Sequence, residues 1–399
     1  MNVRNKMTLN NRWVLPEGIE EVLPAQAMQL EGLRRHLIDM YTTWGYDLVM
    51  PPLVEYLESL LSGTGHDLDL QTFKITDQLT GRMMGIRADM TPQVARIEAH
   101  HLKQNTPTRL CYLGTVLHTR PQGFSASRSP LQIGAELYGH QGSQSDVEIL
   151  SLMVESLKLT GMNNFYIDLG HAGIFRGLVK QAGLSTEQEN QLFDVLQRKA
   201  KPELADLMVE WKLDKKMAAM LTSLPDLSGG EDVFDRALKI FAESNGDVLA
   251  AIKNLQEIAQ QFKAQVPDIN LHYDLSELRG YNYHTGVIFA TYAPGQGEAI
   301  AQGGRYDDIG KDFGVARPAT GFSADLKTLV SLSGLSTKSI KGIFATASNE
   351  SGLLEFISEL RTQGERVVME LPEQNGDAAA MQCNRVITKD GNGWVVKEI

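Results

Sequence analysis

The segment Leu131–Gly139 constrains the fold most, because apolar side chains occupy every second position along it. The apolar positions are Leu131, Ile133, Ala135 and Leu137, and the positions between them are Gln132, Gly134, Glu136 and Tyr138. Successive side chains of a β-strand point to opposite faces, so this alternation predicts a strand with one face in a core. Polar groups around a glycine on the other face suit the floor of a ligand pocket, but a plain solvated sheet face has the same pattern.

Patterns elsewhere along the chain predict further helices and strands, which together indicate the α+β class. The expected helices cover 24–44, 91–101 and several segments of 173–264, where Ser185 and Gln188 fit a capping box. The expected strands are 45–55 (broken by Pro51 and Pro52), 73–76, 83–86, 110–117, 130–139, 270–275, 279–292 and 298–302. They predict a mainly antiparallel sheet with flanking helices.

The length of 399 residues allows more than one domain. We expect a core over residues 1–330, with a helical insertion over about 173–264. Residues 331–399 are expected to form a small C-terminal α/β module, because their pattern reads strand, helix, strand and hairpin, with the last turn at 390–393.

Composition and charge argue against several kinds of site. The formal net charge of −11 gives no general attraction to a polyanion, which argues weakly against nucleic acid as the main partner. The only two cysteines, Cys111 and Cys383, make neither a disulfide framework nor a zinc knuckle. No HExxH motif occurs, and His100 and His101 point apart on a helix, so we expect no metal and no cofactor. With no signal-peptide pattern and no long apolar run, we expect a cytoplasmic protein without a membrane span.

Six segments, in chain order, resemble the signature segments of class II aminoacyl-tRNA synthetases of the histidyl type. They are GYDLVMPPLVE (45–55, motif 1), IRADMTPQ (86–93), LQIGAELYG (131–139, motif 2), RGYNYHTG (279–286, histidine motif), GGRYDD (303–308) and PATGFSADLKTL (318–329, motif 3). Each match alone is weak, but the ordered series is specific. The resemblance implies a class II synthetase-like fold.

The same resemblance implies a histidine-binding pocket. Asp89 and Thr91 match the Glu and Thr with which the family receives the α-ammonium group. Gln132 and Glu136 are four residues apart on one predicted strand, so they face the same side and offer acceptors to ammonium or imidazole N–H groups.

Three residues of the histidine motif complete the expected pocket. Arg279 can bind a carboxylate through two hydrogen bonds, and Tyr281 and Tyr283 share its face if this segment is extended. The competing interpretation is that Asp89, Glu136 and Arg279 form a buried ion-pair network that only supports the fold.

The chain departs from the synthetase pattern where that pattern binds ATP. His118 stands in place of the motif 2 arginine and Thr328 in place of the motif 3 arginine, while Asp325 adds a negative charge and Asn282 replaces an aspartate. Each lost charge-assisted contact is worth roughly 1.5–3 kcal/mol, so two or three together imply a loss on the order of 10³-fold or more. The C-terminal module is also short for an anticodon-binding domain. We therefore expect neither aminoacylation nor tRNA binding.

A histidyl-synthetase-like chain with these losses resembles the regulatory subunits of ATP phosphoribosyltransferase. That resemblance implies a non-catalytic chain that activates the short-form catalytic subunit, within a hetero-octamer, in the first step of histidine biosynthesis. It also implies histidine as the effector that inhibits the complex. Two alternatives stay open, a divergent histidyl-tRNA synthetase and a stand-alone amino-acid-binding paralogue.

Overall fold

The computed structural model describes residues 13–62, 66–121, 127–281, 283–314, 316–333, 341–348, 350–391 and 393–399, with the backbone alone at 66, 67 and 312. Expectations that rest on residues 1–12, Asn282 or Asn392 lie outside the described chain. The chain forms two compact units. The larger comprises Met1–Leu23 and Ala27–Leu335, and the smaller comprises Pro24–Gln26 and Ser336–Ile399.

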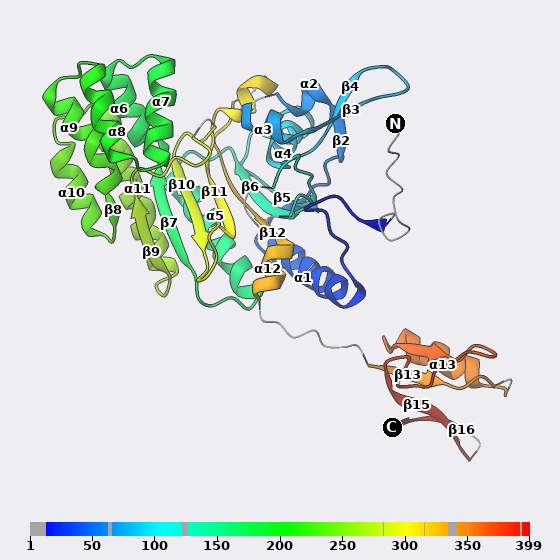
Figure 1. Ribbon diagram of the computed structural model, residues 1–399. Helices are drawn as coiled ribbons and strands as arrows, with labels where there is room; N and C mark the ends of the chain where they lie inside the picture. Colours follow the sequence, from blue (N-terminus) through cyan, green and yellow to red (C-terminus); the bar gives the residue numbers. More distant parts are fainter. Residues whose placement is uncertain are drawn as a thin grey trace, which may run out of the picture. The chain divides into compact units, whose positions relative to one another are not determined.

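A nine-stranded sheet forms the centre of the larger unit (Figure 1). In spatial order its strands are β1 (Asp47–Leu48), β5 (Thr108–Thr115), β6 (Leu131–Tyr138), β12 (Ala319–Asp325), β11 (Ala301–Arg305), β10 (Val287–Tyr292), β7 (Tyr166–His171), β9 (Asn270–Asp274) and β8 (Ser228–Gly229). Among the strand pairs of the described residues, β1–β5 and β7–β9 are parallel and the other pairs of this sheet are antiparallel. The prediction of a mainly antiparallel sheet is confirmed.

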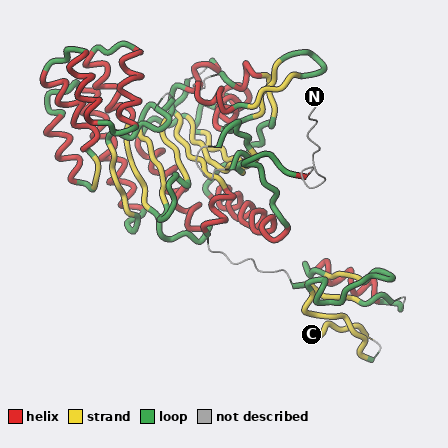
Figure 2. The backbone as a smooth tube through the Cα atoms, viewed as in Figure 1, coloured by secondary structure: helices red, strands yellow, loops and turns green. Residues whose placement is uncertain are grey.

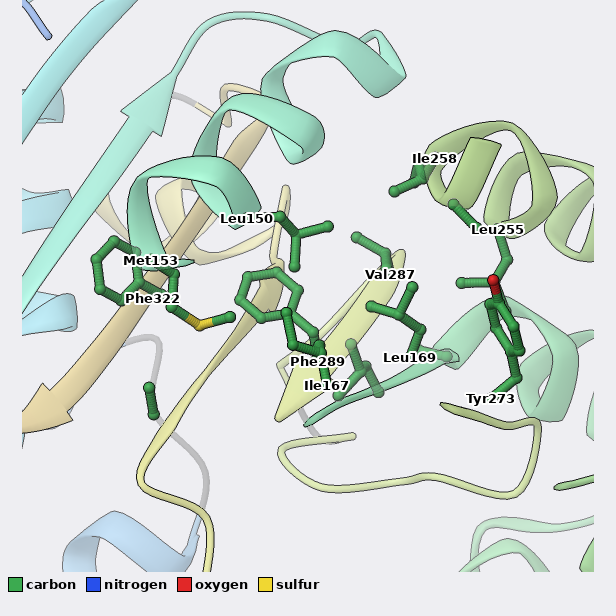
Figure 3. Packing of buried hydrophobic residues seen from close by; sticks show 14 of the residues in the cluster. Leu150, Met153, Ile167, Leu169, Leu255, Ile258, Tyr273, Val287, Phe289 and Phe322 are labelled. Atoms are coloured by element: carbon green, nitrogen blue, oxygen red, sulfur yellow. The ribbon is translucent and has the colours of Figure 1, made fainter. Parts of the chain in front are cut away.

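One face of this sheet is apolar and packs on helices α5 (Ser143–Leu159) and α11 (Gly246–Gln265), as Figure 3 shows. The face is built from alternate strand residues, at most 2% exposed, among them Ile133, Leu137, Ile167, Leu169, Val287, Phe289 and Phe322. Leu150 of α5 and Leu255 of α11 lie against them, and α1 (Pro24–Thr43) and α12 (Leu326–Leu332) belong to the same core. Burying each large aliphatic side chain stabilises the fold by roughly 1.5–3 kcal/mol, which fixes this face inward and leaves the opposite face for polar groups.

A second sheet of the larger unit contains the predicted hairpin. Its order is β2 (Val54–Tyr56), β4 (Met83–Ile86) and β3 (Phe73–Thr76). The nearby helices are α2 (Leu57–Leu60), α3 (His66–Gln71), α4 (Thr91–Ile97) and the π-helix η2 (Glu98–Leu102). Strands β3 and β4 have the predicted bounds. Proline in the first turn of α4 supplies a preset φ where its missing N–H costs nothing, so this helix begins at Thr91 as predicted.

Between β7 and β9 the chain is mainly helical (Figure 2). The helices before α11 are α6 (Ala172–Ala182), α7 (Thr186–Gln197), α8 (Lys201–Glu210), α9 (Lys215–Ser223), η3 (Leu224–Asp226) and α10 (Asp232–Ile240). At the start of α7 the Gln188 backbone N–H donates to the Ser185 hydroxyl at 3.3 Å, and the Ser185 N–H donates to the Gln188 side chain at 2.9 Å. The predicted capping box is therefore confirmed.

The described residues of the smaller unit form a four-stranded sheet and a helix. In spatial order its strands are β14 (Val367–Met369), β13 (Gly342–Ala345), β15 (Cys383–Asp390) and β16 (Gly393–Glu398), and its helix is α13 (Leu353–Thr362). Leu353 and Ile357 of α13 are each 1% exposed and share a core with Ile343 and Ala345 of β13. This unit therefore has a hydrophobic core of its own.

The structure corrects the expected strand over 279–292. Strand β10 begins only at Val287, and the described residues before it form turns. Gly280 has a φ of +61°, and the backbone N–H groups of Tyr283 and His284 both donate to its carbonyl, at 3.0 and 2.9 Å. These local bonds take up the groups that a strand would pair with its neighbour.

Three further elements differ from the expectations. The strand expected at 298–302 lies at Ala301–Arg305 and is followed by η4 (Ile309–Phe313). Helix α5 and strand β7 were absent from the sequence-based prediction.

Candidate functional site

Glycines leave room on the second face of the large sheet, where β6, β12 and β11 run side by side. Gly134, Gly321 and Gly304 belong to these three strands, and Gly321 pairs directly with Gly304. A Cβ atom at Gly321 would overlap the Glu136 carboxylate, and one at Gly304 would overlap the His284 ring. Both side chains can therefore lie directly on the sheet backbone, which favours the pocket-floor interpretation over a solvated face.

The Glu136 carboxylate lies at the centre of this face and is surrounded by hydroxyl groups. It is 1% exposed and accepts hydrogen bonds from Thr91 at 3.1 Å, from Tyr112 at 3.0 Å and from Tyr306. Burial raises the pKa of Glu136 to about 8, although the three hydroxyl donors act in the opposite direction. None of these three hydroxyl partners is a cation, so an ionised Glu136 would be a buried negative charge without a counterion among the described residues.

Asp89 lies beside Glu136 and is held by the predicted site residue Gln132. The Gln132 amide donates to Asp89 Oδ1 at 2.7 Å, and its oxygen accepts from the Met90 backbone N–H at 2.9 Å. The Thr91 N–H also donates to Asp89 Oδ1, at 3.0 Å. Among the described residues, no donor reaches Asp89 Oδ2, so this oxygen is available to a ligand ammonium group.

Tyr283 belongs to the same group of side chains as Glu136 and Asp89. Its ring lies 6.1 Å from the ring of Tyr306, and its side chain is 39% exposed, so it lies between the buried carboxylate and solvent. Partial burial and then the nearby negative charges of Asp89 and Glu136 raise the pKa of Tyr283. The structure thus brings together five of the seven predicted residues, namely Asp89, Thr91, Gln132, Glu136 and Tyr283.

Arg279 and Tyr281 make their contacts elsewhere. The Arg279 guanidinium donates to the Tyr292 hydroxyl and lies 3.8 Å from Glu277. The Tyr281 hydroxyl donates to Glu189 of α7 at 2.5 Å, and its ring packs edge-on against Phe175 of α6. The physical reason is the turn at Gly280, which breaks the common face that an extended segment would have given these two side chains.

Three residues beside these five were not predicted as site residues. Tyr112 stands opposite Gly134 in the β5–β6 register, Tyr306 follows β11, and His284 lies over Gly304. Tyr112 lies in the predicted strand 110–117, but the apolar run 110–113 does not single out this residue. For His284 and Tyr306 the signal was only their place inside the quoted segments 279–286 and 303–308.

A buried ion pair on the other side of the sheet holds Tyr306 in place. Arg305 is 7% exposed and Asp146 1%, and the guanidinium donates to Asp146 Oδ2 at 2.9 and 3.1 Å. Arg305 also donates to Asp307 at 3.2 Å. Because adjacent residues of an extended segment point to opposite faces, anchoring Arg305 below the sheet presents Tyr306 to Glu136 above it.

His118 and Thr328, which were expected at the positions of ATP-binding arginines, make structural contacts. His118 is 7% exposed, and its Nε2 lies 2.9 Å from the Ala88 carbonyl oxygen. The Thr328 hydroxyl donates to Asp325 at 2.8 Å, and Asp325 caps the first turn of α12. The negative charge at Asp325 therefore has a structural function, as an N-cap.

The raised pKa of Glu136 predicts a specific pH dependence of stability. The unfolded chain loses this proton near pH 4.5 and the folded chain only near pH 8, so between these values the carboxyl favours the folded state less as pH rises. Glu136→Gln keeps the shape and cannot ionise. The free energy of unfolding of wild type relative to this variant should fall by roughly 1–1.5 kcal/mol per pH unit between about pH 5 and 8, and become constant above that range. Denaturant titrations of both proteins across this range measure it, and parallel curves would contradict it.

No group of three or more His, Cys, Asp or Glu side chains suited to a metal ion occurs in the described part of the chain. No helix among those same residues is long and apolar enough to cross a membrane.

Comparison with known proteins shows that two family models match this chain. Residues 18–329 match the model described as histidyl-tRNA synthetase, and residues 340–397 match the model described as ATP phosphoribosyltransferase subunit HisZ C-terminal domain. Among solved structures, an ATP phosphoribosyltransferase regulatory subunit/histidyl-tRNA synthetase from Bacillus halodurans C superposes with a TM-score of 0.82 at 26% identity, over 93% of this chain and 96% of that one. A histidyl-tRNA synthetase from Nostoc sp. PCC 7120 gives 0.76 at 18% identity over 97% of each chain, which is a likeness of fold alone. The predicted class II synthetase-like α+β fold is confirmed.

Curated relatives match along almost the whole chain. The ATP phosphoribosyltransferase regulatory subunit of Thioalkalivibrio sulfidiphilus is 55% identical over 395 residues, which are 98% of this chain and 100% of the relative. The one from Alkalilimnicola ehrlichii is 53% identical and covers 98% of each chain. Through its match to these relatives along almost the whole chain, this chain belongs to the family of ATP phosphoribosyltransferase regulatory subunits.

Proposed function

We propose that the chain binds the short-form catalytic subunit of ATP phosphoribosyltransferase, raises its activity and lets histidine inhibit it. The catalytic partner joins ATP to phosphoribosyl pyrophosphate at the start of histidine biosynthesis. In this proposal the chain has no catalytic residue of its own and acts by binding histidine in the Glu136 cluster, defined as Asp89, Thr91, Gln132, Glu136 and Tyr283.

The Glu136 carboxyl, buried among hydroxyl groups beside Asp89, is the observation that carries this proposal. A free oxygen of Asp89 suits the α-ammonium group, and the Glu136 carboxyl suits a ring nitrogen. His118 and Thr328, at the positions that the resemblance assigns to ATP-binding cations, make structural contacts. A pocket that binds an amino acid without activating it is suited to sensing that amino acid.

The two competing functions have less support. A divergent histidyl-tRNA synthetase would need cations for the triphosphate, and neither His118 nor Thr328 supplies the fixed bidentate donors of arginine. A stand-alone amino-acid-binding paralogue would need no partner, whereas the relatives that match along the whole chain are regulatory subunits by name.

The proposed function also requires a stable complex with the catalytic subunit. A regulatory subunit that persists in a complex at working concentrations needs an interface above about 1,000 Å². We propose the hetero-octamer of regulatory and catalytic chains. Histidine would then favour an inactive arrangement of this assembly, with a coupling of about 1–3 kcal/mol, or a roughly 5- to 150-fold effect on affinity.

Replacing Glu136 by glutamine tests the proposed function directly. The variant keeps the shape of the pocket but cannot carry the negative charge, so the histidine concentration for half-inhibition should rise roughly 10- to 150-fold. The measurement is phosphoribosyl-ATP formation by the mixed subunits as histidine is titrated. Activation without histidine should be unchanged, and gel filtration should show the same complex.

Arg279→Ala is the matched control for charge removal outside the Glu136 cluster. Because the Arg279 guanidinium contacts Tyr292 and Glu277, its removal should change half-inhibition less than Glu136→Gln does. Unchanged inhibition in Glu136→Gln would place the effector elsewhere. Separate species at micromolar concentration, with no activation, would contradict the partnership itself.

A further inference from the structure

A cavity of about 400 Å³ lies between the helices α6 and α11, which run side by side in the helical part of the larger unit (Figure 1). Its lining residues come from the end of β7 and from these two helices, and none of them belongs to the Glu136 cluster. Cavities of roughly 300–1,000 Å³ hold small molecules in proteins. This cavity is therefore large enough for a ligand of its own.

The apolar part of the cavity lining has no large side chains. Helices α6 and α11 approach closely at Gly177, where a Cβ atom would lie 2.6 Å from Val248 Cγ2. Gly173, Ala250 and Ala251 also line the cavity. Close packing of the two helices explains Gly177, and the same small residues leave an apolar surface along which the body of a ligand can lie.

The polar part of the lining offers hydrogen-bond donors. His171 is 8% exposed, and its Nδ1 accepts from the Gly173 backbone N–H at 3.0 Å, so its proton lies on Nε2. That proton is donated to Asn254 Oδ1 at 3.2 Å. Burial lowers the pKa of His171 to about 4, so the ring is neutral near pH 7. Asn254 then has its NH₂ group left, for which the described chain offers no acceptor.

Two cations and one carboxylate also line the cavity. Lys180 pairs with Asp247 at 2.8 Å, and both side chains are largely exposed. The Arg176 guanidinium donates to the Tyr281 carbonyl oxygen at 2.9 Å and lies 4.9 Å from the centroid of that ring. No carboxylate in the described part of the chain forms an ion pair with Arg176. The cavity therefore has an excess of positive charge, in a chain whose formal net charge is −11.

We propose that this cavity binds a small molecule that joins an oxyanion, either phosphate or carboxylate, to an apolar body. The Arg176 guanidinium binds the oxyanion through its fork of N–H donors, and Lys180 adds a second positive charge. The Asn254 NH₂ group supplies a neutral donor, while the apolar body lies along the small residues of the two helices. This inference goes beyond the proposed function, because no residue of the Glu136 cluster takes part in it.

Calorimetric titration of the full chain with phenyl phosphate tests this binding, because the probe joins a phosphate group to one apolar ring. We expect saturable binding at one site per chain. Phenol lacks the oxyanion and inorganic phosphate lacks the apolar body, so both should bind more weakly. Benzoate carries a carboxylate on the same ring, and the tighter of the two aromatic anions identifies the oxyanion that the cavity prefers. Saturating L-histidine should leave the affinity for phenyl phosphate unchanged.

Three variants assign the probe to this cavity. Arg176→Gln removes the unpaired cation and should weaken phenyl phosphate binding about 10-fold. Asp247→Asn frees Lys180 and removes a negative charge from the lining, so binding should tighten roughly 2- to 5-fold, and Lys180→Gln should weaken it by a similar factor. Opposite effects from the two members of one exposed ion pair cannot come from a general loss of stability.

The inference fails if phenyl phosphate shows no saturable binding, or if Lys180→Gln and Asp247→Asn both bind it like wild type. Displacement by L-histidine would place the probe in the Glu136 cluster and would also overturn it. Neither result affects histidine inhibition of the complex, so the proposed function is tested separately. Thermal unfolding shows whether Arg176→Gln, which also loses the contact with Tyr281, keeps its fold. The two exposed variants decide the question if it does not.

Discussion

The purified chain should catalyse histidine-dependent exchange between ATP and pyrophosphate at least about 10³-fold more slowly than a histidyl-tRNA synthetase. Activation of an amino acid needs cations that hold the triphosphate in line with the carboxylate. At the two positions that supply them in the synthetase pattern, this chain has His118 bonded to Ala88 and Thr328 bonded to Asp325. Neither contact can be exchanged for a phosphate oxygen without loss of a structural hydrogen bond.

This result has meaning only if the assayed protein is folded and binds histidine. The same preparation should therefore show histidine binding by calorimetry, and a histidyl-tRNA synthetase assayed in parallel should show rapid exchange. Exchange within tenfold of the synthetase would mean that other cations of the chain replace the two arginines. That outcome would support the divergent-synthetase alternative.

Replacing Asp146 by alanine should lower the free energy of unfolding of the larger unit by about 3–5 kcal/mol. The change leaves the Arg305 guanidinium buried without its principal carboxylate, and an unpaired buried charge is costly. Asp307 still lies 3.2 Å from Arg305, so the loss should fall toward the lower end of this range. Denaturant titration with a probe in the larger unit measures the shift.

Asp247→Ala is the matched control, because Asp247 pairs with Lys180 in solvent. These side chains are 62% and 76% exposed, so solvent screening should leave their pair with little effect on stability. Equal losses in the two variants would mean that Arg305 finds another counterion or water. Asp146→Ala should also weaken histidine binding, since Arg305 positions Tyr306 beside Glu136.

The sequence predicted which side chains of this strand share a face, because strand geometry alone determines it. Alternation in Leu131–Gly139 placed Gln132 and Glu136 on one face, and the apolar residues between them required the other face to be the core. Asp89 and Thr91 came from the resemblance, and the structure connects them to the same face through Gln132 and Glu136. The role of these residues in binding histidine stays a prediction.

The histidine motif was harder to predict, since its conformation depends on local bonds rather than periodicity. A run with Tyr281, Tyr283 and Val287 reads as a strand, but Gly280 allows a left-handed turn that periodicity does not register. Tyr112 stands opposite Gly134, and the Tyr306 hydroxyl donates to Glu136. Both contacts depend on the strand register, which the sequence pattern does not determine. Helix α5 is buried on several sides, so its sequence lacks the amphipathic pattern of a surface helix.

The nine-stranded sheet ends on both sides in strands of two residues, β1 and β8. An outer strand normally exposes a row of free N–H and C=O groups on which a second chain can form a further strand. Strands as short as Asp47–Leu48 and Ser228–Gly229 offer too few such groups for that pairing. The two edges of the sheet are thereby poorly suited to extension by neighbouring molecules at high concentration. At these edges recognition of another subunit would rely more on side chains, whose chemistry can distinguish the right partner from a second copy.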